Sequence, residues 1–251
     1  MKCIILAGGY GTRLAEETQT KPKPMVKIGG YPILWHIMKF YSHYGINDFI
    51  ICLGYKGFVI RNYLKKNFVK SKNKKFHYYH DKGNNWNITC VNTGIKTNTG
   101  GRLLKLNKII KENENFCFTY GDGLTNVNIN KAVEFFEKNR KIAAITAITP
   151  PAKYGVLKIK KNLVTKFTEK IDNKKIWING GFFIFNSEIF NFIKDFNTSL
   201  EFSVLPKLVK KKQLCSYKHY GYWQSMDTLR DKMELDKMWR RNKAPWKIWK
   251  K

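Results

Sequence analysis

Three glycines and an arginine follow the first apolar segment of the chain and could hold a phosphate group. Residues 3–7 form a short, unbroken apolar run, which is typical of a strand buried on both faces of a sheet. The run ends at Gly8, Gly9 and Gly11, and Arg13 follows. Glycines let backbone N–H groups turn toward an anion, and a guanidinium pairs well with phosphate oxygens. On these residues alone, a tight strand-to-helix turn explains the glycines equally well.

Two lysines held by prolines come shortly after the glycines. In Lys21-Pro-Lys-Pro-Met25, the prolines stiffen the backbone and fix the directions in which Lys21 and Lys23 project. The pattern is neither the phosphate-binding loop G-x-x-x-x-G-K-[ST] nor the dinucleotide fingerprint G-x-G-x-x-G. A glycine-rich turn followed by a rigid pair of lysines predicts a site for a polyphosphate.

Two aspartates at predicted turns are candidate metal ligands. Asp122 lies between two glycines after an apolar run at 116–120, and open parallel sheets bind ligands beyond such strand ends. Asp227 precedes a predicted helix at 228–238. Neighbouring carboxylates repel each other without a cation, and Mg²⁺ takes one or two carboxylates together with waters and phosphates. Each residue also has a structural explanation, Asp122 as a turn former and Asp227 as a helix N-terminal residue.

Strand-like and helix-like segments alternate along the first half of the chain. Apolar runs and helical periodicity predict buried strands at 3–7, 48–53, 116–120 and 143–148, and helices at 32–41, 58–68 and 131–139. Such alternation favours an α/β fold with a doubly wound, parallel sheet. Pro150-Pro151 is the main predicted internal boundary.

Shorter segments follow that boundary. Three β-type stretches are predicted at 155–159, 163–169 and 176–185. Apolar segments bounded by charge predict helices at 190–196 and 204–209. A strand at 214–217 and the helix at 228–238 are the last predicted elements.

The composition bounds the class of protein. A chain of 251 residues with 43% hydrophobic and 15% aromatic residues is sufficient for a sizeable core. No apolar run approaches the roughly 18–20 residues that a membrane-spanning helix needs. The apolar start is too short for a secretory signal, so we expect a cytoplasmic protein. Five cysteines without a C-x-x-C pair predict reduced, buried thiols.

A formal net charge of +29 is compatible with nucleic acid, an anionic membrane surface or anionic small substrates as partners. The lysines are spread along the chain and accompany many Asn, Ile, Phe and Tyr residues, so a bias toward A/T-rich codons is the favoured explanation. No RNA-binding aromatic motif, zinc-finger spacing or helix-turn-helix pattern is present. We therefore expect neither nucleic acid nor a membrane as a partner.

Several ordered motifs resemble the sugar-1-phosphate nucleotidyltransferase family. Gly8-Gly-Tyr-Gly-Thr-Arg-Leu14, followed by the braced lysines, is similar to the family signature. The similarity to the branch that uses CTP and glucose 1-phosphate extends through residues 29–38, 120–123, 179–183, 221–231 and 244–246. Because the motifs run from Met1 nearly to the last residue, chance agreement does not explain them.

The resemblance implies the fold, the partners and the reaction. The implied fold is the nucleotidyltransferase (GT-A-like) fold, a doubly wound, mostly parallel (Rossmann-like) sheet with an inserted β-rich sugar-binding part. It forms a single domain, 1–251, whose half 1–149 binds the nucleotide and whose half 150–251 binds the sugar phosphate and ends in a helical segment. The implied reaction joins CTP to glucose 1-phosphate with Mg²⁺ as the cofactor, in a homo-oligomer.

The resemblance also implies a role for each matching residue. Those implied to bind the nucleotide are Leu6, Ala7, Gly8, Gly9, Gly11, Thr12, Arg13, Lys23, Gly101 and Arg102. Arg13 and Lys23 would be catalytic, and Lys21 is the additional lysine of the CTP-using branch. The residues implied to bind the sugar phosphate are Lys170, Asn179 and Gly180, and those implied to bind Mg²⁺ are Asp122 and Asp227.

Two positions depart from the family pattern. Glu169-Lys170-Ile171 replaces Glu-Lys-Pro and loses the proline that would fix the backbone after Lys170. Asn92 stands where the family usually has Asp, which bears on ligand selectivity. The alternatives are a nucleotidyltransferase for another nucleotide or sugar phosphate, a noncatalytic nucleotide-sugar-binding subunit, and a basic protein that binds RNA or a membrane surface.

Overall fold

The computed structural model describes residues 1–70, 77–81, 83–150, 156–160, 162–168 and 176–249. Nine of its strands form one sheet: β1 (Lys2–Ala7), β4 (Asp48–Leu53), β5 (Val69–Lys70), β6 (His77–Asp81), β7 (Trp86–Asn92), β8 (Asn115–Tyr120), β10 (Ala143–Ile148), β13 (Ile178–Asn186) and β14 (Leu214–His219). Their order is β14-β10-β13-β8-β1-β4-β7-β6-β5. Only β13 and β6 run against the direction of the other strands of this sheet. The predicted α/β fold with a mostly parallel sheet is confirmed.

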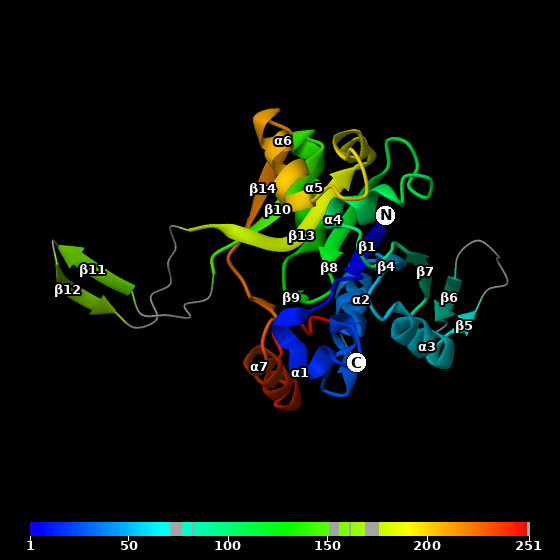
Figure 1. Ribbon diagram of the computed structural model, residues 1–251, viewed down its shortest axis with the longest axis horizontal. Coiled ribbons are helices and arrows are strands. Elements are labelled where there is room, and N and C mark those ends of the chain that lie inside the picture. Colours follow the sequence, from blue (N-terminus) through cyan, green and yellow to red (C-terminus); the bar gives the residue numbers. More distant parts are fainter. Residues whose placement is uncertain (71–76, 82, 151–155, 161, 169–175, 250–251) are drawn as a thin grey trace.

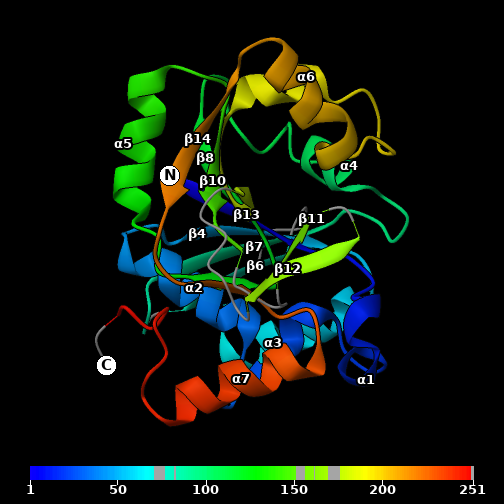
Figure 2. The same cartoon turned by 90° about the vertical axis from the view of Figure 1, so that its left-hand side faces the viewer.

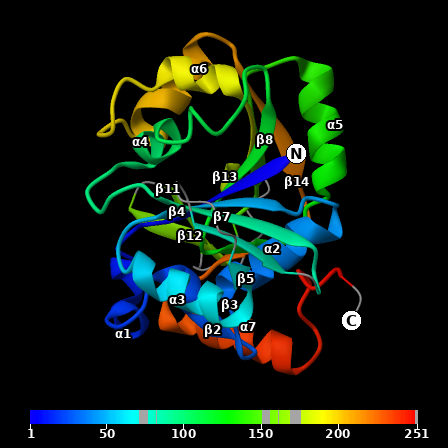
Figure 3. The same cartoon turned by 90° about the vertical axis from the view of Figure 1, so that its right-hand side faces the viewer.

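Helices cover both faces of the sheet (Figures 2 and 3). One face carries α2 (Ile33–His43), α3 (Gly57–Asn67), α5 (Ile129–Asn139) and α7 (Leu229–Arg240). The other face carries α4 (Thr99–Leu104), α6 (Leu205–Lys210), the 3-10 helix η3 (Ser187–Phe192) and the π-helix η4 (Leu200–Val204). None of the helices in the described ranges is long and apolar enough to cross a membrane.

Strand β1 is buried on both faces, as its unbroken apolar run predicts. Cys3, Ile5 and Ala7 point into the core shared with α2, while Ile4 and Leu6 point into the core shared with α4 and α6. All five cysteines are free, and four of them are buried, as predicted. The central strand is therefore held between two apolar layers, which fixes the position of the loop that leaves its end.

The carboxyl ends of four parallel strands meet at one edge of the sheet. In the register of the sheet, Leu6 pairs with Tyr120, Ala7 with Leu53, and Leu53 with Asn92. The glycine-rich loop after β1 and the Gly121-Asp122-Gly123 turn after β8 therefore start side by side. This edge is where an open parallel sheet places its ligands.

Three small two-stranded sheets complete the described structure: β2 (Lys27–Ile28) with β3 (Tyr31–Pro32), β9 (Gly123–Thr125) with β15 (Trp223–Ser225), and β11 (Val156–Lys160) with β12 (Leu163–Thr168). The β9–β15 pair brings the turn after β8 against the segment before α7. The β11–β12 hairpin stands beside the body of the molecule in Figure 1. At the start of β12, Leu163 and Val164 expose 73% and 55% of their surfaces.

Two predicted helices differ from the structure. The segment predicted as a helix at 190–196 is instead the 3-10 turn η3, which ends at Phe192. Asp195 and Thr198 hydrogen-bond each other and their own backbone in the following turn, which competes with helix formation. Pro32, predicted as the first helical residue, belongs to β3 and precedes the first turn of α2.

Candidate active site

A cavity of about 580 Å³ opens at the carboxyl edge of the sheet. It is lined by the loop after β1, the η2 turn (Lys23–Met25), the ends of β8 and β13, two residues each of α4 and β15, and one residue of η4. Its polar lining residues include Thr12, Arg13, Lys23, Thr99, Arg102, Tyr120, Asp122, Asn179, Glu201, Ser225 and Asp227. Most of the predicted site residues that the structure describes are thus gathered in one place.

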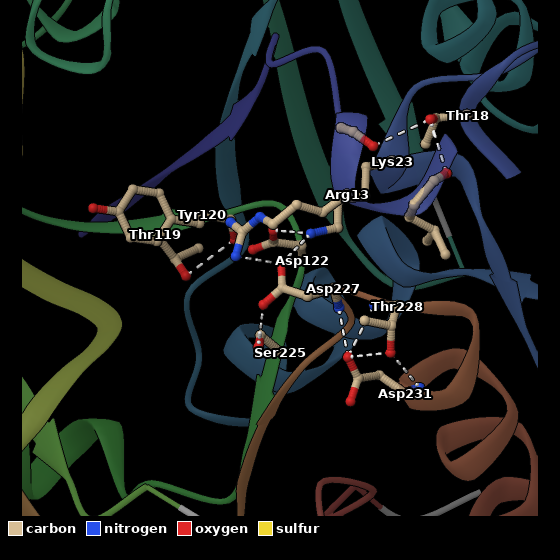
Figure 4. A network of polar contacts seen from close by, with 12 residues as sticks. Arg13, Thr18, Lys23, Thr119, Tyr120, Asp122, Ser225, Asp227, Thr228 and Asp231 are labelled. Atoms are coloured by element: carbon tan, nitrogen blue, oxygen red, sulfur yellow. Dashed lines mark hydrogen bonds and ion pairs between the residues drawn. The ribbon is translucent and has the colours of Figure 1, made fainter. Parts of the chain in front are cut away.

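Lys23 lies between the two aspartates that the sequence marks as metal ligands (Figure 4). Its Nζ is 2.7 Å from Asp122 Oδ2 and 2.7 Å from Asp227 Oδ1. Only 7% of Lys23 is exposed. Its side chain folds back into the cavity, where two carboxylates compensate the cost of burying its charge.

Backbone packing explains how Lys23 reaches Asp122. Pro22 and Pro24 flank Lys23 in the short η2 turn. A Cβ atom on Gly121 would lie 2.8 Å from Pro24 Cγ, so only glycine allows this proline to approach the strand end so closely. Pro24 and Gly121 therefore bring the lysine turn and the aspartate turn together.

Asp227 has two further partners in the same cluster. Arg13 Nη1 lies 3.3 Å from its Oδ1, and the Ser225 hydroxyl donates to its Oδ2 at 2.7 Å. Burial raises the pKa of Asp227, but the hydrogen bonds from Lys23 and Ser225 and the charges of Lys23 and Arg13 outweigh it and hold that pKa below its ordinary value. We call Arg13, Lys23, Asp122 and Asp227 the charged cluster.

The structure also removes the alternative role of Asp227 as a helix cap. Thr228 is the N-terminal cap of α7, and its side chain accepts from the Asp231 backbone N–H while the Asp231 carboxylate accepts from the Thr228 backbone N–H. This reciprocal pair satisfies the start of the helix. The Asp227 side chain points instead toward Lys23 (Figure 4).

The glycines after β1 meet different structural requirements. Gly11 adopts φ 68°, in the left-handed region, and leads directly into the turn that carries Thr12 and Arg13. A Cβ atom on Gly8 would lie 2.2 Å from Arg102 Nη1, whereas one on Gly9 would meet no atom within 4 Å. Gly9 therefore opens onto the cavity, and Gly8 makes room for an arginine.

That arginine, Arg102, holds the strand-end loops together. Its guanidinium donates to the Gly8 carbonyl at 3.0 Å, the Thr93 hydroxyl at 2.8 Å and the Gly94 carbonyl at 2.7 Å. Burial lowers its pKa. The guanidinium thus braces the glycine-rich loop, and the implied contact with the base or ribose stays a prediction.

Gly101 packs against the chain rather than lining the cavity. A Cβ atom there would lie 2.0 Å from the Phe196 carbonyl oxygen, so glycine lets α4 touch the segment before η4. Its implied contact with the nucleotide is likewise a prediction.

Two other residues that the sequence analysis discussed already have partners within the chain. Lys21 forms an ion pair with Glu17 at 2.7 Å, and Asn92 accepts a hydrogen bond from the Gly94 backbone N–H at 3.1 Å.

The residues implied to bind the sugar phosphate are described in part. Asn179 and Gly180 line the cavity at the start of β13. Asn179 Oδ1 accepts from the Gly181 N–H at 2.7 Å, and the Trp223 indole N–H donates to the Gly180 carbonyl at 2.6 Å. Lys170 lies outside the described residues.

Several cavity residues were not identified from the sequence as site residues. Ser225 and Trp223 lie in a motif that carries the family resemblance. Their closeness to Asp227 in the sequence could have identified them as site residues. Thr99, Tyr120 and Glu201 line the cavity from α4, β8 and η4. Glu201 lies in the five-residue π-helix η4, which is too short to show a helical periodicity, so no sequence pattern pointed to it.

The charged cluster has the chemistry of a divalent metal site completed by a substrate. Among the described residues, no group of three or more His, Cys, Asp or Glu side chains could hold a metal by itself. Asp122 and Asp227 supply carboxylate oxygens on both sides of one ammonium group, so a cation fits between them. Phosphate oxygens and waters would complete the coordination of a hard cation.

The protein therefore has an α/β fold whose cavity, at the carboxyl ends of the parallel strands, contains the two cationic and two anionic side chains of the charged cluster. The model of the nucleotidyl transferase family matches residues 2–237, and this chain belongs to that family. The family generally uses a divalent metal.

Relatives at 39–46% identity support this assignment, and a solved structure shares the fold. A glucose-1-phosphate cytidylyltransferase of Salmonella typhimurium is 46% identical over 99% of this chain and all of its own length. A Bacillus subtilis protein described as a probable glucose-1-phosphate cytidylyltransferase is 39% identical over the same shares. The structure of a UDP-glucose pyrophosphorylase complexed with UDP-glucose has a TM-score of 0.70 and 17% identity, and covers 96% of this chain and 98% of its own. The last similarity concerns the fold alone.

Proposed function

We propose that this chain is a glucose-1-phosphate cytidylyltransferase, which converts CTP and α-D-glucose 1-phosphate into CDP-glucose and pyrophosphate. The observation that carries the proposal is the 46% identity with the Salmonella enzyme over the whole length of both chains. The charged cluster supports the reaction class, because Lys23 and both aspartates of a working site are retained and adjacent. A noncatalytic subunit would have no need to keep all three.

The chemistry requires two anions to meet. A phosphate oxygen of glucose 1-phosphate attacks the α-phosphorus of CTP in line, a new P–O bond forms, and the bond to the β-phosphate breaks to release pyrophosphate. The protein positions the two substrates and neutralises their charge, so no covalent intermediate with the protein is needed. The open backbone at Gly9 and the exposed Arg13 guanidinium face the incoming polyphosphate.

Lys23 supplies the central positive charge of the site. When CTP binds, its ammonium moves from the two carboxylates to the phosphate oxygens, where it stabilises charge that develops on the α-phosphate. Asp122 and Asp227 would hold Mg²⁺, which would supply charge neutralisation to the phosphates. Asn179 and Gly180 are proposed to bind sugar hydroxyls, and Lys170 the phosphate of the sugar.

Two further properties belong to the proposal. We expect the enzyme to work in the cytoplasm, where five unpaired cysteines stay reduced. We also expect a homo-oligomer, as the family resemblance implies. Light scattering coupled to size-exclusion chromatography measures the mass in solution, and a monomer at micromolar concentration contradicts the second expectation.

A product assay tests the proposed reaction. The purified chain is incubated with Mg²⁺, each of CTP, UTP, dTTP, ATP and GTP, and a panel of sugar 1-phosphates, and released pyrophosphate is measured. We expect the highest kcat/KM with CTP and glucose 1-phosphate. A clear preference for another pair assigns the chain to another branch of the family, and no pyrophosphate with any pair contradicts enzymatic activity.

A further inference from the structure

A third carboxylate in the cavity, Glu201, has surroundings unlike those of Asp122 and Asp227. Glu201 Oε1 accepts from the Tyr120 hydroxyl at 2.6 Å, and its Oε2 accepts from the Thr99 hydroxyl at 2.6 Å and the Ser199 hydroxyl at 2.9 Å. In the described part of the chain, no Lys, Arg or His forms an ion pair with it. Three hydroxyls from three different segments converge on one carboxylate.

The direction of these hydrogen bonds determines what the cavity wall can bind. A carboxylate accepts and donates nothing, and each hydroxyl has a single proton to give. Because Tyr120 and Thr99 direct their protons at Glu201, their oxygens present lone pairs to other groups. Thr99, Tyr120 and Glu201 all line the cavity, and we call them the acceptor wall.

The acceptor wall is tied in place by the backbone around it. The Leu200 N–H donates to the Thr99 hydroxyl at 2.9 Å, and Ser199 accepts from the Phe202 N–H at 3.1 Å. A Cβ atom on Gly181 would lie 2.7 Å from Tyr120 Cδ2, so glycine lets the backbone of β13 contact the tyrosine ring. The wall is therefore preorganised and needs no ligand to orient its hydroxyls.

A preorganised wall of acceptors selects groups that donate. Phosphate oxygens are repelled by Glu201 and find no donor on Thr99 or Tyr120, so this part of the cavity suits hydroxyl or amine groups. Tyr120 is only two residues from Asp122, a separation of at most about 7 Å between Cα atoms. A hexose bonded directly to its phosphate fits this short reach, whereas cytosine is separated from the phosphates of CTP by the ribose.

We propose that Thr99, Tyr120 and Glu201 recognise hydroxyl groups of the sugar phosphate. Glu201 is the positioning residue, because it fixes the direction of the Thr99 and Tyr120 hydroxyls. The inference rests on the proposed function and extends it to the choice of sugar. A sugar that lacks the matching hydroxyl leaves a desolvated acceptor unpaired, which is the arrangement that discriminates most strongly between analogues.

The test combines enzyme variants with sugar analogues. KM and kcat are measured at saturating CTP for glucose 1-phosphate and its 2-, 3-, 4- and 6-deoxy analogues, with the wild type, Glu201→Gln and Tyr120→Phe. We expect at least one deoxy analogue to raise the wild-type KM by about tenfold, the equivalent of one charge-assisted hydrogen bond. In Glu201→Gln, the KM for glucose 1-phosphate rises by about tenfold and the penalty for that analogue falls to about twofold. Tyr120→Phe gives the same pattern with a smaller amplitude.

Glu188→Gln is the matched control, because Glu188 is an exposed glutamate of η3 that does not line this cavity. It should behave as the wild type with every sugar. An unchanged sugar KM in both Glu201→Gln and Tyr120→Phe overturns the inference. A changed preference between CTP and UTP with an unchanged sugar KM also overturns it, because the wall then contacts the base. If the wild type forms no product with any substrate pair, the proposed function itself fails, which is a distinguishable result.

Discussion

Asp227 and Glu201 are carboxylates in the same cavity, but of the two only Asp227 has cations among its partners in the described structure. Asp227 is contacted by the cations Lys23 and Arg13, whereas Glu201 is contacted only by hydroxyls in the described structure. The Lys23 and Arg13 side chains beside Asp227 can turn toward an incoming phosphate and pair with it. Hydroxyls held by Glu201 present lone pairs to an incoming sugar. One cavity is thereby divided between charge neutralisation and recognition of donor groups.

We expect the largest effect when the charged cluster loses its central residue, Lys23. Lys23→Ala should lower kcat by roughly 10²–10³, the usual effect of losing one preorganised transition-state donor. Steady-state kinetics with CTP and glucose 1-phosphate measure it. Lys21→Ala is the matched control, since Lys21 pairs with Glu17 rather than with the aspartates. Near-normal turnover in Lys23→Ala with a defect in Lys21→Ala would identify the other lysine as catalytic.

The same variant should be less stable without metal. Removing the ammonium leaves the Asp122 and Asp227 carboxylates facing each other, which should lower the free energy of unfolding by about 1–2 kcal/mol after allowance for their partial exposure. Mg²⁺ should restore stability in Lys23→Ala more than in the wild type. Urea unfolding with and without Mg²⁺ measures both effects, and an equal response of the two proteins would show that the cation does not bind between the aspartates.

The aspartates should show the next largest effect. Asp122→Asn and Asp227→Asn should each remove most activity, with partial recovery at raised Mg²⁺ or with Mn²⁺, because an amide is a weaker ligand than a carboxylate. Metal titrations of kcat measure this. Asp231→Asn is a useful comparison, since Asp231 belongs to the cap of α7 and should affect stability rather than metal dependence. Full activity of Asp227→Asn would remove this residue from the site.

A smaller effect should appear in the pH dependence of stability. The pKa of Asp227 is lowered in the folded protein, so its contribution is present above the ordinary aspartate value and is lost as the pH falls through the lowered value. The difference in unfolding free energy between the wild type and Asp227→Asn should be constant from about pH 8 to 5 and shrink below about pH 4. Urea unfolding across this range measures it, and a difference that grows in acid contradicts the assigned ion pairs.

Local motifs predicted the parts of the site that are formed by residues close together in the sequence. The apolar run of β1 and the glycines after it identified the loop, and the strand before Asp122 predicted its place at the sheet edge. The burial of Lys23 was not predictable in this way, because its partner Asp227 is 204 positions away. The Thr228-x-x-Asp231 capping pair was a readable signal that Asp227 is not needed as a cap.

Arg102 and Glu201 show what sequence reasoning missed. The partners of Arg102 are mainly backbone carbonyls, which no side-chain pattern reveals. Glu201 gains its neighbours through contact of η4 with α4 and β8, which only the tertiary structure brings together. Both residues depend on long-range packing rather than on local spacing.

A comparison of the steady-state kinetics of two single variants tests most directly whether one part of the cavity neutralises charge and another binds the sugar. Asp227→Asn and Glu201→Gln each replace one carboxylate by an amide of the same shape, and each is assayed for kcat, for KM of both substrates and for metal dependence. We predict that Asp227→Asn lowers kcat and alters metal dependence, whereas Glu201→Gln raises the KM for glucose 1-phosphate and leaves metal dependence unchanged. The same kinetic signature from both variants would contradict the account.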